Sequence, residues 1–391
     1  MQRQRYIAVL SAFLASLLAA GLLFAQAPAP TPDTVVLADK KEKTGQVAKE
    51  TYKELSLQDA KGGTETIQWA NIADVRYGDR PGSCISGDSA FSRGDYAQAL
   101  EGYRQVVADV DGNKARAIFR QHGLIGVARS LVALRKHDDA VKAFNDLLTK
   151  EPDSRFLRDA HLGIVAALRA KGDAAGATNA ITRAATEAKS KSLEEEFSIR
   201  LTLLKAGLLE DDKKWADAQN EYSSIARKAD KYPVLSAAAK IGLGRSMLNV
   251  GQDQKAMAHF TELQNAASSN RYLLCGALSG LGDCAFAAGE KSKQPNDYRT
   301  ALGYYVKAGV IGFPGKGEPS AEHERALFMA GCAYQALSTV YTEEQAKRFF
   351  AKRAELAFRE LIAEYPASTY VDPAGKRLKE VLVTAGAAEE Q

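Results

Sequence analysis

The sequence predicts a mainly α-helical protein: an α-solenoid of about seven helix pairs, preceded by a small β-barrel-like unit. Three observations lead to this prediction. A frame built on one alanine and one aromatic residue recurs along most of the chain. A period-two apolar pattern precedes it, and an uncharged apolar stretch stands near the N-terminus. The 391 residues are 46% apolar and 26% charged, an ordinary globular composition that excludes wholesale disorder.

The first 27 residues have the features of a secretory signal peptide. Arg3 and Arg5 supply a positive start, and the stretch 6–24 is apolar and uncharged. Ala25-Gln26-Ala27 then forms a small-x-small cleavage site. We therefore expect residues 1–27 to be removed after Ala27 and the mature chain to act in the periplasm. The alternative is an uncleaved membrane anchor, because the stretch is about as long as a bilayer span.

Export places the cysteines in an oxidising compartment, where thiols can pair. The four cysteines form no CxxC motif and no paired metal-ligand spacing; they are Cys84, Cys275, Cys284 and Cys332. Cys275 and Cys284 lie nine residues apart on one expected helix, which is too far for a bond between them. A Cys284–Cys332 disulfide is geometrically possible, but we favour small buried thiols.

Residues 28–33 form a linker, and residues 34–80 follow a period of two that predicts a small β unit. Lys61-Gly62-Gly63 predicts a turn between two strands. We expect four or five short strands to close, or nearly close, because closure hides their edges. The pattern V-x-L-x-D…G-x-V…L-x-L…I-x-W-x-x-I-x-x-V resembles small SH3-like or Sm-like barrels. The apolar positions are Val47, Leu55, Leu57, Ile67, Trp69, Ile72, Val75 and Tyr77.

Charge argues against a nucleic-acid partner. The β unit carries nine acidic and eight basic residues between Asp33 and Arg80, and the whole chain has 52 basic against 48 acidic residues. Phosphate binding needs a positive surface, which this balance does not supply. Export would also remove the chain from cytoplasmic RNA.

Between residues 84 and 370 one frame recurs in seven copies. Each copy has an alanine on an expected second helix, with an aromatic or large apolar residue four positions later. The alanines are Ala99, Ala140, Ala177, Ala218, Ala256, Ala301 and Ala354. Upstream first helices carry a glycine in a small-residue position: Gly126, Gly163, Gly244, Gly282 and Gly331. A lone helix pair of this length cannot bury its apolar face, so the copies must stack.

This frame, as in G94-D-Y-A-Q-A99-L-E-G-Y103, resembles the tetratricopeptide repeat. The resemblance implies antiparallel helix pairs that let helix backbones approach through small residues, with the aromatic filling the gap to the next helix. The copies are 37 to 53 residues apart, longer than the family's 34, so loops or helices must be extended. The polar stretch 290–297 reads as an insertion between two helices, and residues 371–391 read as a capping helix and tail.

Such an array twists into a superhelix whose concave groove is lined by first helices, and grooves of this kind hold peptides or other proteins. In the inferred frame the residue after the small position points toward the groove. Those positions hold Arg129, Arg245, Asp283 and Cys332. We select Arg129, Arg245 and Asp283 as partner-binding candidates, since the arginines could pair with a partner's carboxylates.

Tests for catalytic and metal motifs fail. The run 309–317 has Val310 where a phosphate loop needs glycine and Gly317 where it needs serine or threonine. The nucleophile elbow GxSxG is absent, and the five histidines show neither HxxxH nor HExxH spacing. The acidic runs lack the alternation of a calcium loop. We therefore predict no enzyme activity, no cofactor and no metal.

The functional prediction is an interaction scaffold of the bacterial cell envelope that binds a peptide or protein in the groove. The chain looks like periplasmic tetratricopeptide proteins, some of which assist outer-membrane assembly or division-linked complexes; this is an analogy of fold and leader. One alternative is a structural protein that self-assembles into homo-oligomers. Another is a module whose β unit docks on peptidoglycan or a membrane surface. A third, the non-catalytic arm of a hydrolase, lacks an acid–base cluster.

Overall fold

The computed structural model describes residues 31–227, 231–267, 270–313, 321–366 and 368–386. The expected signal peptide, residues 1–27, lies outside the described residues. The chain divides into two units, Met1–Ile85 and Ser86–Gln391, and each is described by itself.

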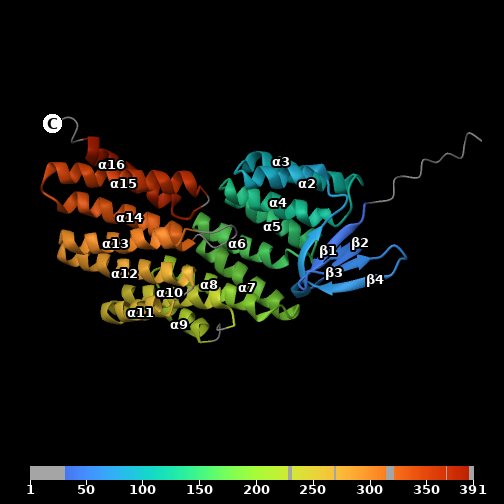
Figure 1. Ribbon diagram of the computed structural model, residues 1–391, viewed down its shortest axis with the longest axis horizontal. Helices are drawn as coiled ribbons and strands as arrows, with labels where there is room; N and C mark the ends of the chain where they lie inside the picture. The colour runs from blue at the N-terminus through green and yellow to red at the C-terminus, as the bar shows by residue number, and fades with distance from the viewer. Residues whose placement is uncertain (1–30, 228–230, 268–269, 314–320, 367, 387–391) are drawn as a thin grey trace, which may run out of the picture. The chain divides into compact units, whose positions relative to one another are not determined.

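The first unit contains a five-stranded antiparallel sheet (Figure 1, blue). Its strands are β1 (Asp33–Leu37), β2 (Glu42–Glu50), β3 (Glu54–Gln58), β4 (Thr64–Gln68) and β5 (Ile72–Arg76), in the order β4-β3-β2-β1-β5. The short 3₁₀ helix η2 (Trp69–Asn71) connects β4 to β5. The predicted turn is present: Gly62 has a φ of +87°, and the Asp59 side chain accepts hydrogen bonds from the backbone N–H groups of Lys61 and Gly63.

One face of the sheet supplies the small core of this unit. The fully or nearly fully buried side chains are Val35, Val47, Leu55, Leu57 and Ile67. The Asp33 carboxylate is also buried, and it accepts hydrogen bonds from the Val47 N–H (2.7 Å) and the Gly78 N–H (3.0 Å). Asp33 therefore joins the first strand to the segment that leaves the last one.

The expected barrel is not closed. β4 and β5 are the two edges of the sheet, and no pairing joins them in the described residues. The expectation assumed that edges must be hidden by closure. Here the edges are instead short strands of five residues that carry charge, such as Glu65 on β4 and Asp74 on β5. Short charged edges discourage further strand pairing without closure.

The second unit is the predicted array of helix pairs (Figure 1, cyan to red). Fifteen helices are present in the described residues, which gives seven pairs and a final capping helix, α16 (Val371–Gly386). The pairs are α2 (Gly82–Ser92) with α3 (Tyr96–Asp111), α4 (Phe119–Ala133) with α5 (His137–Lys150), α6 (Leu157–Lys171) with α7 (Ala174–Ser190), α8 (Glu195–Asp211) with α9 (Trp215–Ala226), α10 (Pro233–Asn249) with α11 (Asp253–Ala266), α12 (Arg271–Ser292) with α13 (Pro295–Ile311), and α14 (Ala321–Val340) with α15 (Glu344–Glu364).

First and second helices have different neighbours. From α4 to α14, each even-numbered helix packs against the next even-numbered helix as well as against both odd-numbered helices beside it in the sequence. The odd-numbered helices contact mainly the even-numbered ones. First helices therefore form one close-packed side of the array, and second helices form the other side.

Small residues and rings make the close packing possible, as the sequence predicts. All seven anchoring alanines are completely buried, and the residue four positions later is buried as well: an aromatic ring in six pairs and Ile181 in the third. A Cβ atom on Gly244 would lie 2.5 Å from the ring of Phe260, and one on Gly331 would lie 2.5 Å from the ring of Phe358. Each ring therefore occupies the space that a side chain on the facing helix would need.

The turns within the first five pairs share one backbone feature. Five residues before the anchoring alanine the chain adopts a positive φ, at Gly94, Arg135, Gly172, Lys213 and Gly251. Glycine adopts this conformation without strain, whereas Arg135 and Lys213 adopt it at a cost of about 1 kcal/mol or more. The left-handed backbone conformation therefore recurs in these turns, although the residue that adopts it varies.

Helix α12, which has 22 residues, differs in two ways from what the sequence suggests. The polar stretch predicted as an insertion at 290–297 is mostly helical, because α12 runs to Ser292 and α13 begins at Pro295. Helix α12 is also long and apolar enough to cross a membrane, but two thirds of its most apolar window is buried inside the protein. Since it packs against α10, α11, α13 and α14, it is a core helix of the array.

We predict that Gly163→Ala destabilises the array and that Gly303→Ala does not. A Cβ on Gly163 would lie well inside van der Waals distance of the Phe144 ring, so we expect a loss of about 1–3 kcal/mol in the free energy of unfolding. Gly303 lies inside α13 with nothing within 4 Å of an added Cβ, so alanine should add about 0.5–1 kcal/mol of helix stability. Urea unfolding followed by circular dichroism measures both, and equal effects would contradict the packing argument.

Candidate functional site: a charged cavity on the first-helix side

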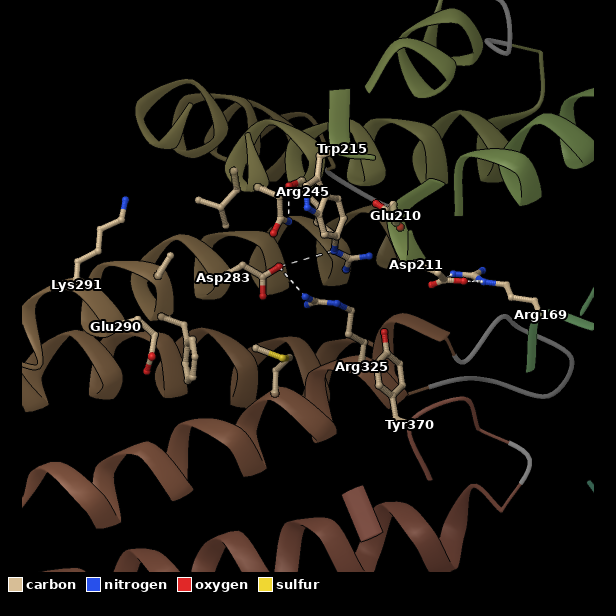
Figure 2. A pocket seen from close by; sticks show the side chains of 15 residues that line it. Arg169, Glu210, Asp211, Trp215, Arg245, Asp283, Glu290, Lys291, Arg325 and Tyr370 are labelled. Atoms are coloured by element: carbon tan, nitrogen blue, oxygen red, sulfur yellow. Dashed lines mark hydrogen bonds and ion pairs between the residues drawn. The ribbon is translucent and has the colours of Figure 1, made fainter. Parts of the chain in front are cut away.

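A cavity of about 630 Å³ lies on the first-helix side of the array (Figure 2). Its walls come from α6, α8, α10, α12 and α14, with Trp215 from α9 and Tyr370 from the turn before α16. Its larger apolar side chains are Trp215, Leu248, Phe286, Met329 and Tyr370. Its polar side chains are Arg169, Glu210, Asp211, Arg245, Asn249, Asp283, Glu290, Lys291 and Arg325.

Arg245 and Glu322 form a buried ion pair beside this cavity. The guanidinium of Arg245 donates two hydrogen bonds to the Glu322 carboxylate, at 3.1 Å and 2.5 Å. Both side chains are more than four-fifths buried. A two-point contact of this kind fixes the plane of the guanidinium as well as its position.

Asp283 lies between two arginines in the same cluster, as Figure 2 shows. Its Oδ2 atom is 2.9 Å from Nη2 of Arg325 and 3.7 Å from Nε of Arg245. Its Oδ1 atom accepts a hydrogen bond of 2.8 Å from the Tyr305 hydroxyl. The cluster therefore ties together α10, α12, α13 and α14, which belong to three successive pairs.

Electrostatics keeps this cluster charged. Burial acts to lower the pKa of the Arg245 guanidinium, but the carboxylates of Glu322 and Asp283 outweigh burial, so that pKa is raised. Burial likewise opposes a charged Arg325, and Asp283 helps to hold its pKa above the usual value. Two arginines and two carboxylates balance each other, so the cluster introduces no net charge into a buried position.

The edge of the cavity is also paired within the chain. Arg169 donates two hydrogen bonds to Asp211, at 2.5 Å and 2.9 Å, and Lys291 forms an ion pair with Asp253. Glu210 is different: burial raises the pKa of its carboxyl group, although the positive charges of Arg245 and Arg169 act to lower it. The cavity thus presents fixed, mutually compensated charges together with apolar surface.

The structure brings two of the three sequence-predicted candidates together. Arg245 and Asp283 lie in the cavity wall, although both are paired inside the chain. Arg129 does not line this cavity; it lies 3.2 Å from Asp159 and over the ring of Phe156. Cys332, at the equivalent position of the seventh pair, is buried in the core.

Sequence reasoning missed Arg325 and Glu322. Arg325 lies seven residues before Cys332 on α14, which is two helical turns and therefore the same face. A search of each first helix seven residues before the groove position would have identified Arg325. Glu322 lies in the first turn of α14, where an acidic residue is favourable at a helix start and gives no sign of a buried partner.

The array's cysteines do not form the disulfide that the sequence left open. Cys284 and Cys332 are buried thiols in different parts of the core, and Cys275 donates a weak hydrogen bond to the Ala308 carbonyl. Burial raises the pKa of the Cys284 thiol to about 12 and that of Cys332 to about 11. Such thiols are unreactive because the thiolate is scarce at neutral pH.

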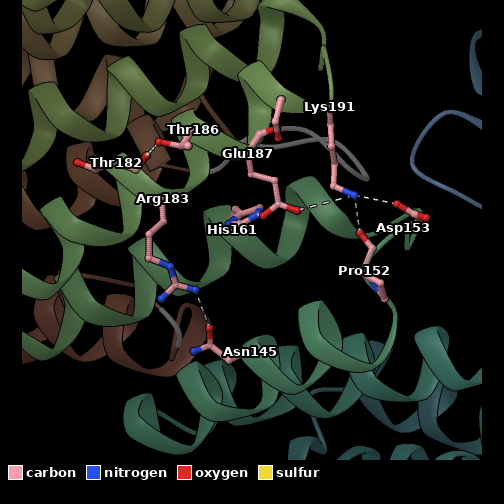
Figure 3. Close-up of polar contacts among 10 residues, drawn as sticks. Asn145, Pro152, Asp153, His161, Thr182, Arg183, Thr186, Glu187 and Lys191 are labelled. Atoms are coloured by element: carbon pink, nitrogen blue, oxygen red, sulfur yellow. Dashed lines mark hydrogen bonds and ion pairs between the residues drawn. The ribbon is translucent and has the colours of Figure 1, made fainter.

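A second polar cluster, around His161 on α6, is structural (Figure 3). Its Nε2 atom lies 2.9 Å from Glu187 Oε2 on α7, and Glu187 in turn lies 3.9 Å from the Lys191 ammonium. Burial lowers the pKa of His161, and Glu187 opposes the shift only partly. Lys191 also bonds Asp153 at 2.7 Å, so the cluster joins neighbouring pairs. The described residues contain no group of three or more His, Cys, Asp or Glu placed to hold a metal ion.

Comparison with known proteins supports the repeat architecture. Residues 124–154, which cover most of α4, all of α5 and the four residues after it, match the family model of the tetratricopeptide repeat. The chain is therefore a helical repeat protein with a small N-terminal sheet, and its array contains at least one tetratricopeptide repeat. No curated protein matches the sequence.

Solved structures similar to this chain share little sequence with it. A tetratricopeptide repeat protein from Parabacteroides merdae has 13% identity and a TM-score of 0.49, over 77% of this chain and 97% of that one. A Rap protein in complex with competence and sporulation factor has 14% identity and a TM-score of 0.40, over 78% and 98%. NprR in complex with its peptide NprX has 13% identity and a TM-score of 0.41, over 79% and 87%.

We predict that Arg245→Met costs about 3–5 kcal/mol of unfolding free energy, because it leaves the buried Glu322 carboxylate without its partner. The double variant Arg245→Met, Glu322→Leu should recover most of that loss. The control is Arg129→Met, which breaks a half-exposed pair and should change stability by less than about 1 kcal/mol. Denaturant unfolding measures all three. A double variant no better than the single one would contradict a pairwise origin of the effect.

Proposed function

We propose that this chain is a non-enzymatic interaction protein whose array binds a peptide or protein segment in the charged cavity. The observation that carries the proposal is the convergence of five successive first helices on one cavity with an apolar lining and fixed charges. Ligand sites combine mainly apolar walls with a few placed polar groups, and helical-repeat arrays present such sites on their inner side.

The paired charges favour this use of the cavity. Side chains that are already held in one geometry lose little freedom when a ligand binds, so more of the contact energy appears as affinity. Arg245 and Asp283 are held by partners on neighbouring helices before any ligand arrives. Trp215, Phe286 and Tyr370 supply aromatic surface, which contributes strongly to binding when buried.

The proposed setting is the bacterial cell envelope. The support is the leader at residues 1–27, with two arginines, an uncharged apolar stretch and a small-x-small site ending at Ala27. A chain exported in this way would meet its partner in the periplasm, as an envelope scaffold. The buried, high-pKa thiols of Cys284 and Cys332 are compatible with an oxidising compartment, because thiols of this kind resist oxidation.

We predict that Ala287→Trp abolishes partner capture while Ala288→Trp preserves it. Ala287 lines the cavity, whereas its neighbour Ala288 is exposed on α12 and does not line it. An indole at position 287 would fill space that the ligand needs. Crosslinking in the native envelope followed by mass spectrometry would identify partners of the wild-type chain and quantify them in both variants. Equal recovery with both variants would show that the partner binds elsewhere.

We also predict that the exported chain begins at Pro28. Intact mass and N-terminal sequencing of the protein purified from the periplasmic fraction measure the cleavage site directly. Replacing Ala27 with a bulky residue, as in Ala27→Leu, should block processing and leave the chain in the membrane fraction. A wild-type chain that keeps residues 1–27 would identify an anchor instead, and a cytosolic chain would end the envelope assignment.

A further inference from the structure

Exposed apolar side chains gather on the second helices at the end of the array. Ten large apolar side chains are exposed in the described residues, and five of them lie on or directly beside α13 and α15: Val306, Val310, Phe313, Phe349 and Leu356. Val310 is 75% exposed, Phe313 63% and Phe349 52%. Single exposed apolar residues are ordinary on protein surfaces, but a local concentration marks an interaction surface.

Aromatic and arginine contacts join the two helices into one surface. The Arg299 guanidinium on α13 lies 5.3 Å from the centre of the Tyr341 ring, which stacks on Phe350 of α15 at 5.2 Å. Phe349 packs edge-on against Phe350, also at 5.2 Å, and Arg353 lies 5.4 Å from the Phe349 ring centre. We call this region the outer surface; it comprises the exposed side chains of α13 and α15 together with Tyr341 and Phe350.

The outer surface is positively charged. Helix α13 has no acidic residue after Asp297, and its exposed charges from there to Ile311 are Arg299 and Lys307. On α15, Lys352, Arg353 and Arg359 are exposed on the same side as Phe349 and Leu356. The exposed acidic residues of the two helices are Glu344, Glu360 and Glu364, all on α15. Glu355 is mostly buried between Lys352 and Arg359, at 2.9 Å and 2.8 Å. With Arg348, which is also exposed on α15, the outer surface has six exposed basic residues and three exposed acidic ones.

We propose that the outer surface docks the array onto an anionic phospholipid bilayer. Apolar side chains on a basic helix face can enter the boundary between headgroups and acyl chains while lysine and arginine contact lipid phosphates. Phe349 and Leu356 are seven residues apart, two turns on one side of α15, and Lys352 and Arg353 lie between them. That arrangement lets apolar and basic side chains meet a flat surface together.

A lipid surface fits this region better than a peptide does. A peptide needs a groove, whereas the exposed residues project from helix faces; an added Cβ on Gly303 of α13 would meet nothing within 4 Å. The proposed surface lies on second helices and leaves the cavity on the first helices open. Docking and ligand binding therefore use different residues and can fail separately.

The test is flotation of the exported chain, beginning at Pro28, with vesicles of phosphatidylcholine alone or mixed with phosphatidylglycerol. This chain contains every described element and lacks the apolar leader, which would bind lipid by itself. We expect binding only to vesicles that contain phosphatidylglycerol, and a marked loss of binding at high salt. Lys352→Gln with Arg353→Gln should lower the partition coefficient about tenfold or more, since each basic residue contributes roughly fivefold.

A second variant tests the apolar contribution without touching the aromatic cluster. Val310→Ser replaces the most exposed of these side chains and should weaken binding several-fold without affecting folding. The matched control combines Met257→Ser on α11 with Lys142→Gln on α5, both exposed elsewhere on the array, and should bind as the wild-type chain does. Absence of vesicle binding, or equal losses in the control and the surface variants, would overturn the proposal.

Discussion

The contact between an aromatic ring and a glycine on the facing helix sets the geometry of the array. Phe260 shows it most clearly: the ring lies between Gly244 of its own pair and Gly280 of the next, and a Cβ on either glycine would collide with it. The ring thereby fixes the distance between helices both within and between pairs. Because interiors are close-packed and respond to a single methyl group, this distance has little freedom. The spacing of the first helices follows from such contacts in the pairs that have a ring at this position.

The charged cluster is a consequence of that spacing. Arg245 and Glu322 are 77 residues apart in the chain, yet their side chains meet because α10, α12 and α14 lie side by side. Between these closely packed helices the two arginines and two carboxylates are largely buried. Their charges must therefore compensate each other, since a lone buried charge would cost several kcal/mol. The charged side chains of this cluster also line the cavity. Packing thus comes first, and the cavity's chemistry depends on it.

The repeat architecture could be predicted from the sequence because it depends on the spacing of residues that are close together in the chain. Alanine with an aromatic or large apolar residue four positions later identifies one helix face within one turn, and this pattern located all seven pairs. Closure of the sheet could not be predicted in this way, because it depends on whether distant edges meet. The pairing of Arg245 with Glu322 depends on the rotation between pairs, which no local pattern encodes. The left-handed backbone conformation of Arg135 and Lys213 could not be predicted either. The turn of the repeat requires this conformation, whereas arginine and lysine by themselves disfavour it.

The two sides of the array differ physically because first helices pack against one another, whereas second helices pack mainly against first helices. Where first helices approach closely, polar side chains are forced into networks and their orientation is fixed, as for Asp283 between Arg325 and Tyr305. Where second helices face outward, side chains such as Val310 and Arg353 have no neighbouring repeat to pair with and remain exposed. Fixed polar groups suit recognition of one ligand geometry, whereas exposed basic and apolar groups suit a surface with no fixed geometry, such as a bilayer. One packing rule therefore leaves fixed polar groups on the first-helix side and exposed basic and apolar groups on the second-helix side of the same chain.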